Sequence, residues 1–372
     1  MAKSEINKIE IELTSRCNAA CPSCNRTDID GKAIRSLPIT DITASEFVEI
    51  LSPDWIRGRQ IKLCGVYGDP VVAPDVLEIS QYVVENDGQL VINTNASMRN
   101  EKFWSDLGHL MSDSEGSECI FSIDGLEDTN AIYRRNTSWS KIMQNASAYI
   151  KAGGYAHWDY LVFSHNEHQV EEAQQLAKQM GFKKFTVKKT TRASEDKKPT
   201  AIEVALDIKP SQKEEYRNSL LSDSQPSHDS SPSQPQAESN TPENSSLWKK
   251  ITGLGGTKEP PPIACFTRGE SASQSIKERS VYISAQKRLW PCCWWAGAEF
   301  PRARPVRDLY RAVGEDFNLL GKNSIDDVIN HAWFKRSLVR SWNSMSSAPQ
   351  VCSKNCNRAQ PLNNEDCEDV FL

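Results

Sequence analysis

Three cysteines near the start of the chain are the residues whose type and spacing most clearly indicate chemistry. Cys17, Cys21 and Cys24 follow a C-x3-C-x2-C spacing, directly after the apolar-alternating run Ile9–Leu13. Thiolates are the usual protein ligands of iron–sulfur clusters, and a cubane held by only three of them keeps one iron open for another ligand. A structural zinc site usually takes four protein ligands, and no histidine or fourth cysteine lies nearby in the sequence. The spacing favours a three-thiolate cluster, with a partial zinc site or a disulfide plus a spare thiol as the alternatives.

A second group of cysteines lies toward the C-terminal end. Six of the eleven cysteines fall between Cys265 and Cys367. Short-spaced cysteines in a reducing compartment more often hold metal than form disulfides. Their spacing alone does not distinguish zinc from an iron–sulfur cluster. Cys64 and Cys119 lie in apolar runs, where a cysteine is expected to be a small buried apolar residue.

Short apolar runs alternate with helical periodicity over the first 188 residues, and the first helix is expected to begin at the capping-box pattern Thr43–Glu46. Such alternation predicts an α/β fold with a parallel sheet covered by helices, either a barrel or an open sheet. Chemistry in such folds lies at the carboxyl ends of the strands, so the segments after the strands are expected to meet at one edge. The expected strands are Ile9–Leu13, Ile61–Cys64, Leu90–Ile92, Cys119–Ile123, Tyr160–Phe163 and Phe185–Val187.

The segment from Glu12 to Cys24 resembles the signature of the radical S-adenosylmethionine (radical SAM) enzymes. In that family three cysteines hold a [4Fe–4S] cluster whose open iron binds SAM. An electron from the reduced cluster cleaves SAM to methionine and a 5′-deoxyadenosyl radical, which removes a hydrogen atom from the substrate. The resemblance implies a partial (β/α)6 barrel and a low-potential electron donor such as flavodoxin or ferredoxin.

Two further stretches resemble segments of that family that contact SAM. Gly65–Pro70 resembles the Gly-Gly-Glu-Pro loop that receives the SAM amino group, with Tyr67-Gly68-Asp69 in place of Gly-Gly-Glu. Ser122–Gly125, with an arginine beyond it, resembles the segment that meets the ribose and carboxylate of SAM. Without the resemblance, both stretches would be read as turns. The cofactor-binding residues that the resemblance implies are Tyr67, Gly68, Asp69, Pro70, Asn95, Ser122, Asp124, Arg134 and Arg135. Lys188–Arg192 is expected to be either a SAM- or substrate-facing segment or a basic loop, and no catalytic residue is assigned.

The C-terminal cysteines are similar to those of the auxiliary-cluster domains called SPASM and twitch, which follow many radical SAM barrels. The resemblance implies a second [4Fe–4S] cluster, with Cys293 as the alternative to Cys292 and Cys367 as a spare or late ligand. Lys287 stands where the family motif usually has glycine, and the small number of cysteines favours the single-cluster twitch form. A four-cysteine zinc site is the alternative. The implied ligands are Cys265, Cys292, Cys352 and Cys356.

Three regions are expected along the chain. Residues 1–205 form the barrel, and residues 206–262 form a disordered linker because the segment is rich in Ser, Pro, Gln and Asn with almost no large apolar residue. Residues 263–372 form a small cysteine-bearing domain. Within it we expect a hairpin of Val281–Ser284 and Leu289–Cys293, and one amphipathic helix from a cap at Ser324 to Trp342.

Composition limits the function classes. The net charge of -5 gives no clear signal for nucleic acid, and no apolar run approaches a membrane span or a signal peptide. We therefore expect a cytoplasmic protein. The leading hypothesis is oxidative modification of a peptide or protein side chain by a radical SAM enzyme. The alternatives are dehydrogenation of a small alcohol or sugar and, from another class, a non-enzymatic iron–sulfur or zinc protein.

Overall fold

The computed structural model describes residues 3–27, 32, 34–189, 279–300, 302–356 and 367–371. The expected linker, Cys265 and Thr190–Arg192 lie outside the described residues. In the part of the chain that the structure describes, no helix is both long and apolar enough to cross a membrane.

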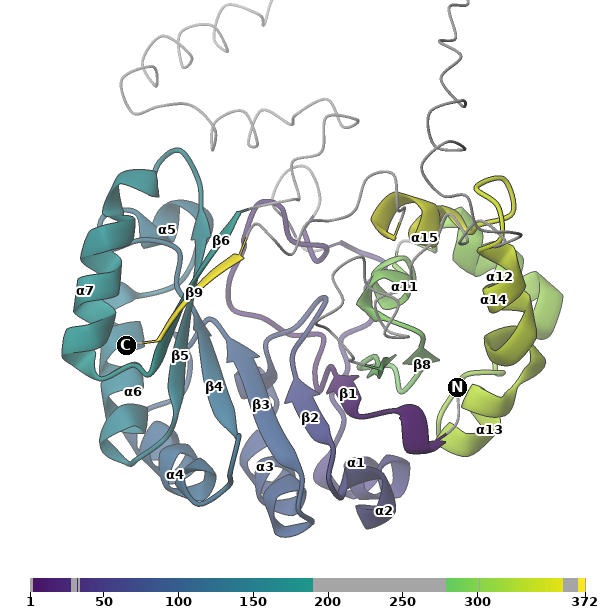
Figure 1. Cartoon of the computed structure of the whole chain (residues 1–372), viewed down its shortest axis with the longest axis horizontal. Helices are drawn as coiled ribbons and strands as arrows, with labels where there is room; N and C mark the ends of the chain where they lie inside the picture. The colour runs from purple at the N-terminus through teal and green to yellow at the C-terminus, as the bar shows by residue number, and fades with distance from the viewer. Residues whose placement is uncertain are drawn as a thin grey trace, which may run out of the picture.

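Six parallel strands form the centre of the molecule, in the order β1-β2-β3-β4-β5-β6 (Figure 1). Each coincides with one of the expected strands, so the prediction of a parallel sheet is confirmed. Their bounds are β1 Lys8–Ile11, β2 Gln60–Leu63, β3 Gln89–Thr94, β4 Glu118–Ser122, β5 Ala156–Val162 and β6 Lys184–Lys189.

Helices follow the strands and cover one side of the sheet. The first of them begins at the expected capping box: Thr43 Oγ1 accepts a hydrogen bond from the Glu46 amide, and Glu46 Oε2 accepts one from the Thr43 amide. The helices are α1 Ala44–Ile50, α2 Pro53–Ile56, α3 Val76–Glu85, α4 Glu101–Ser112, α5 Asn130–Tyr133, α6 Trp139–Lys151 and α7 Val170–Met180. Short 3-10 helices are η1 Lys3–Glu5, η2 Pro70–Val72 and η3 Glu167–Gln169.

The two faces of the strands differ in chemistry. Alternate strand residues such as Ile9, Ile61 and Trp158 belong to the main apolar core, together with residues of the covering helices. Residues between them carry charge, and His157 and Asp159 of β5 lie 3.1 Å apart (Nε2 to Oδ1). This alternation explains why β5 begins four residues before the expected Tyr160, since only its last part is a continuous apolar run.

The residues after 279 extend the same sheet at both edges. Strand β7 (Ser280–Ile283) pairs in parallel with β1 and forms the expected hairpin with β8 (Leu289–Trp290). Strand β9 (Cys367–Phe371) pairs antiparallel with β6. In the hairpin loop Lys287 has a φ of +58°, a conformation that glycine adopts at lower cost and that fits the usual glycine at this place.

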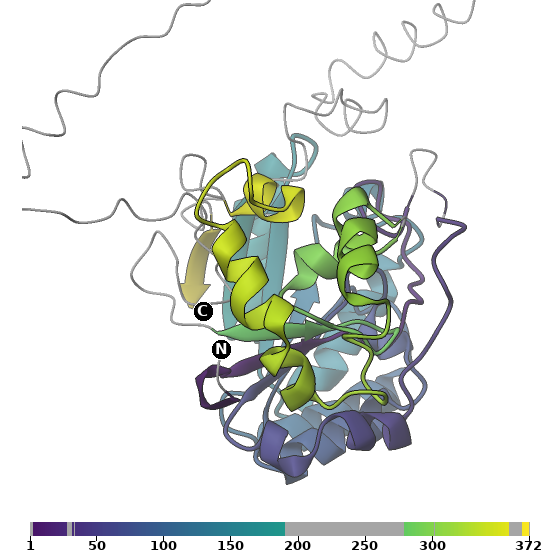
Figure 2. The same cartoon turned by 90° about the vertical axis from the view of Figure 1, so that its right-hand side faces the viewer.

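The helices of the C-terminal part lie beside β7 and β8 (Figure 2). They are α11 Cys293–Gly297, α12 Arg304–Val313, α13 Ile325–Asn330, the π-helix η5 Trp333–Ser337, α14 Leu338–Ser341 and α15 Gln350–Asn355. The capping box at Ser324 is confirmed. The expectation of one continuous helix to Trp342 is wrong, because α13 is ended by its C-cap residue His331, whose φ and ψ of -58° and 144° are not helical.

Candidate functional site

The three N-terminal cysteines lie in the loop that follows β1. Cys21 is buried, and Cys17 and Cys24 are partly buried and pack against the same small apolar cluster, which includes Tyr133 and Phe163. Burial and the nearby Asp69 carboxylate raise the pKa of Cys17 to about 12. Three thiols, one buried and two partly buried, therefore lie in one loop at the carboxyl end of the first strand.

The Gly65–Pro70 loop, at the end of β2, packs directly on the backbone that leads into Cys17. A Cβ on Gly68 would lie 1.7 Å from the Thr14 carbonyl oxygen, so only glycine permits this approach. The Asp69 amide donates to the Arg16 carbonyl at 2.9 Å. The glycine of the predicted loop is thus required by contact with the cysteine segment.

Glu12 holds the same loop from the end of β1. Its side chain is fully buried, and Oε1 accepts hydrogen bonds from the amides of Tyr67 and Gly68 at 2.6 and 2.9 Å. Burial raises the pKa of Glu12 to about 7, with these amides acting in the opposite direction. The period-2 alternation before the cysteines places Glu12 off the apolar face, but nothing in the sequence indicates its partners.

Asp69 binds the end of β3. Its carboxylate accepts hydrogen bonds from Thr94 Oγ1 at 2.8 Å, from the Asn95 amide at 2.8 Å and from Asn95 Nδ2 at 2.7 Å. Asn95 Nδ2 also lies 3.8 Å from the Cys17 thiol. The prediction that Asp69 receives the amino group of SAM therefore requires some of these contacts to be exchanged, whereas Asn95 already faces a cysteine.

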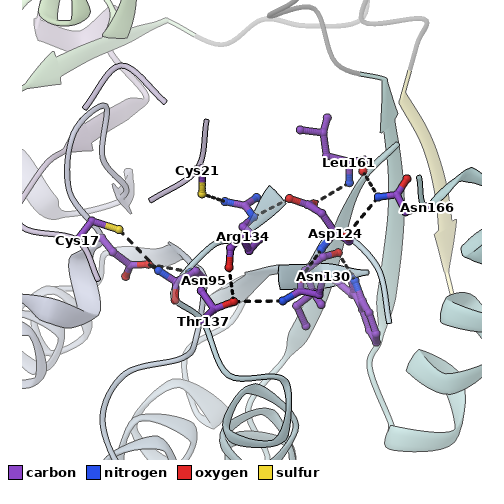
Figure 3. Close-up of polar contacts among 12 residues, drawn as sticks. Cys17, Cys21, Asn95, Asp124, Asn130, Arg134, Thr137, Leu161 and Asn166 are labelled. Atoms are coloured by element: carbon purple, nitrogen blue, oxygen red, sulfur yellow. Dashed lines mark hydrogen bonds and ion pairs between the residues drawn. The ribbon is translucent and has the colours of Figure 1, made fainter. Parts of the chain in front are cut away.

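The buried carboxylate of Asp124 and the partly buried guanidinium of Arg134 form an ion pair beside Cys21 (Figure 3). Arg134 Nε donates to Asp124 Oδ2 at 2.6 Å, and Arg134 Nη1 lies 4.0 Å from the Cys21 thiol. Burial raises the pKa of Cys21, and the guanidinium of Arg134 opposes that rise. Of the two predicted arginines, Arg134 has its side chain directed at a cysteine.

Asp124 is itself held by its neighbours in Figure 3. Its Oδ1 accepts from the Leu161 amide at 2.9 Å, and its own amide donates to Asn130 Oδ1 at 2.9 Å. Asn166 Nδ2 donates to the Asp124 carbonyl at 3.1 Å. Neither asparagine is predicted from the sequence, because an isolated asparagine at the start of a short helix carries no spacing signal of its own.

The remaining predicted cofactor residues contribute in other ways. Arg135 contacts the cysteine loop through its backbone, since its carbonyl accepts from the Ala20 amide at 3.0 Å. Ser122 is at the end of β4, opposite Asp159 of β5. Pro70 begins η2 and is buried. The Tyr67 hydroxyl is bonded to residues of the C-terminal part.

The C-terminal cysteines gather around a small cavity. Cys292, Cys352 and Cys356 line it together with Trp295 and Trp342. Burial raises the pKa of the Cys352 thiol, and the neighbouring Trp342 and Trp295 side chains act to lower it. Trp295 and Trp342 therefore form part of the shell around these cysteines, and such a shell controls the access of solvent to a metal site.

The alternative ligand Cys293 does not line this cavity. Its thiol instead interacts electrostatically with Cys64 and Lys62 of the β2 region. Cys265 lies outside the described residues, and the side chain of Cys367 is not described. Three of the four implied auxiliary ligands thus line one cavity, and Cys293 packs against the same apolar cluster without lining that cavity.

The donor atoms fit iron–sulfur clusters at both places. Each site offers buried or partly buried thiols, with the Arg134 guanidinium beside Cys21 at the first and two tryptophan side chains beside Cys352 at the second. Within the described ranges, no group of three His, Cys, Asp or Glu side chains is close enough to hold a single metal ion. A cubane is larger than one ion and sets its thiolates further apart.

Comparison with solved structures identifies chains of similar fold. Polyhistidine-tagged anSMEcpe with bound AdoMet has a TM-score of 0.52 at 12% identity, and the match covers 94% of this chain and 85% of that chain. Streptococcus suis SuiB bound to S-adenosylmethionine has a TM-score of 0.50 at 14% identity, over 93% and 77%. A further SuiB structure, with a TM-score of 0.47 at 13% identity, is matched over 79% of this chain and 62% of that chain, less than two thirds of its length.

No protein-family model and no curated protein matches the sequence. At 12 to 14% identity, the likeness to SuiB and anSMEcpe is a likeness of fold. The predicted fold class is confirmed: this chain has the α/β partial-barrel fold, built on parallel strands, of two structures that hold S-adenosylmethionine.

Proposed function

We propose that this chain is a radical SAM enzyme. The observation that carries the proposal is the meeting of three thiols, one buried and two partly buried, with Asn95 and the Asp124–Arg134 pair, at the carboxyl ends of β1, β3 and β4. Parallel α/β folds place their chemistry at this edge. When bound, a [4Fe–4S] cluster would supply the electron that cleaves SAM to a 5′-deoxyadenosyl radical.

The residues of the chain then have distinct roles. Cys17, Cys21 and Cys24 would hold the cluster. Arg134 places a positive charge beside Cys21 and favours its thiolate, and Asp124 holds that guanidinium in place. The small apolar cluster around the cysteines keeps water away from the thiols.

We further propose that the reaction is an oxidative modification of a peptide or protein side chain. The support is a second group of buried cysteines in the same molecule, which would hold an auxiliary [4Fe–4S] cluster able to accept the substrate electron. A low-potential donor of the flavodoxin or ferredoxin type would reduce the first cluster, in the cytoplasm. Dehydrogenation of a small alcohol or sugar would use the same residues.

The test is anaerobic reconstitution with iron and sulfide, followed by reduction in the presence of SAM. The wild-type protein should form 5′-deoxyadenosine and Cys17→Ala should not. Cys119→Ala is the matched control, because Cys119 is buried in the main core and belongs to neither cysteine group. If the Cys17→Ala yield equals that of wild type, the proposal is wrong.

Metal content tests the second site in the same preparation. About eight irons per chain are expected for two [4Fe–4S] clusters. About four irons and one zinc would contradict the auxiliary cluster while leaving the first one in place.

A further inference from the structure

Tyr67 joins the Gly65–Pro70 loop to the C-terminal part of the chain. Its side chain is 1% exposed, and its hydroxyl lies within hydrogen-bonding distance of the carbonyl oxygens of Ala296, Gly297 and Phe300, at 3.2, 3.0 and 3.1 Å. The hydroxyl also accepts a hydrogen bond from the Phe300 amide at 3.2 Å. One side chain of the loop is therefore bound to the carboxyl end of α11. The corresponding position of the family loop is glycine, which has no side chain to do this.

Helix α11 belongs to the C-terminal cysteine site. Cys292 is its N-cap residue, and Trp295, in its middle, lines the same cavity as Cys292, Cys352 and Cys356. The helix is only five residues long, so a shift at its cysteine end also moves the carbonyls that bind Tyr67.

The backbone of Tyr67 continues the contact toward the first cysteine group. The Tyr67 and Gly68 amides donate to the buried carboxylate of Glu12, and the next residue, Asp69, binds Asn95. Asn95 in turn contacts Cys17. The contacts therefore run without a break from one cysteine site to the other.

A second contact supports the same connection. A Cβ on Gly297 would lie 2.7 Å from Asn25 Nδ2 and 3.3 Å from Val66, so the end of α11 packs closely on both. Asn25 follows Cys24 directly, and the Val66 amide donates to the Tyr282 hydroxyl of β7 at 3.1 Å. The Gly65–Pro70 loop is thus held by the C-terminal part at two neighbouring residues.

We infer that Tyr67 is a positioning residue through which the state of the Cys292, Cys352 and Cys356 site sets the conformation of the Gly65–Pro70 loop, and with it the affinity for SAM. The inference rests on the proposed function. It gives the second cysteine site a role in cofactor binding in addition to electron transfer. Because coupling between two sites is reciprocal, SAM binding should also make the α11 region more rigid.

The first experiment compares Tyr67→Phe with Tyr82→Phe in reconstituted protein. Tyr82 also donates its hydroxyl to a backbone carbonyl, that of Leu51 at 3.3 Å, and it lies on α3. Phenylalanine keeps the ring and removes only the hydroxyl. The Kd for SAM should rise about threefold to tenfold in Tyr67→Phe, the effect of one lost buried hydrogen bond, and stay unchanged in Tyr82→Phe. Hydrogen exchange at the Tyr67 and Gly68 amides should accelerate by a similar factor.

The second experiment tests the connection itself. Cys352→Ser should weaken SAM binding in the wild-type background and have a much smaller effect in the Tyr67→Phe background, because the path is already broken there. Equal effects in the two backgrounds would overturn the inference, as would an unchanged Kd in Tyr67→Phe. If amide hydrogen exchange in Tyr67→Phe accelerates equally in the core strand β3, the variant is destabilised throughout, and the inference would also be overturned. If wild-type protein does not bind SAM, the proposed function itself has failed.

Discussion

Replacing Asp124 by asparagine tests the electrostatics of the candidate site directly. Asp124 is 0% exposed and accepts hydrogen bonds from Arg134 Nε at 2.6 Å and from the Leu161 amide at 2.9 Å. Asparagine keeps the shape of the side chain but leaves the Arg134 guanidinium without its counter-charge. The amide nitrogen of the asparagine would also face another donor, either Arg134 Nε or the Leu161 amide. Removing one partner of a buried pair costs about 3–5 kcal/mol, so the free energy of unfolding should fall by about that amount. A loss of about 3 kcal/mol in the free energy of unfolding corresponds to a fall in Tm of roughly 6–12 °C.

The assay is urea unfolding of the cluster-free protein followed by circular dichroism. Asp106→Asn is the matched control, since it breaks an exposed pair with Lys102 and should change stability little. The Asp124→Asn variant should also show faster alkylation of Cys21, because the unpaired charge of Arg134 lowers the pKa of that thiol further. A loss of stability below about 1 kcal/mol would refute the assignment of Asp124 as the residue that holds Arg134.

Two further changes test the loop and the barrel interior. Gly68→Ala should destabilise the fold by about 1–3 kcal/mol and weaken SAM binding, because the added methyl group would collide with the Thr14 carbonyl; unchanged SAM titrations would contradict this. Burial lowers the pKa of His157, but Asp159 and Glu118 raise it by more, so the folded-state pKa lies above the unfolded-state value of about 6.5. The protonated His157 therefore stabilises the fold fully below about pH 6.5. This stabilisation disappears as the pH rises through the folded-state pKa. Urea unfolding of wild type and His157→Gln should therefore show a difference that shrinks toward high pH, and a difference constant from acidic to alkaline pH would contradict it.

The fold could be predicted where local pattern decides it. The capping box at Thr43 and the six apolar runs depend on residues close together in the chain, and each produced the expected element. The predicted boundaries were wrong for two elements, because contacts between residues far apart in the chain determine where those elements begin or end. Strand β5 extends back to Ala156 because His157 and Asp159 find charged partners on neighbouring strands, Glu118 and Lys188.

The continuous helix expected up to Trp342 is the second place. Its apolar spacing fits one helix, yet α13 is ended by His331 and the chain continues as a π-helix. The apolar residues on the two sides of this break pack differently. Val328 joins the main core and Leu338 joins the cluster around the C-terminal cysteines, so a single straight helix would not serve both.

The sequence alone determined that three thiols lie close together in one loop, and where in the fold that loop lies. The spacing of Cys17, Cys21 and Cys24 specifies three thiols in one loop, since residues three and four apart cannot separate far. The run of strands before and after them places that loop at the carboxyl edge of a parallel sheet. Nothing beyond local spacing and period is needed for either conclusion.

Only the tertiary structure decided which residues hold the site together. Asp69 meets Asn95, 26 residues away, and the Tyr67 hydroxyl meets Ala296, 229 residues away. The different surroundings of Cys292 and Cys293 also depend on the fold: Cys292 lines the cavity with Cys352 and Cys356, and Cys293 interacts electrostatically with Cys64. Partners of this kind are brought together by the packing of strands and helices, so no local pattern in the chain records them.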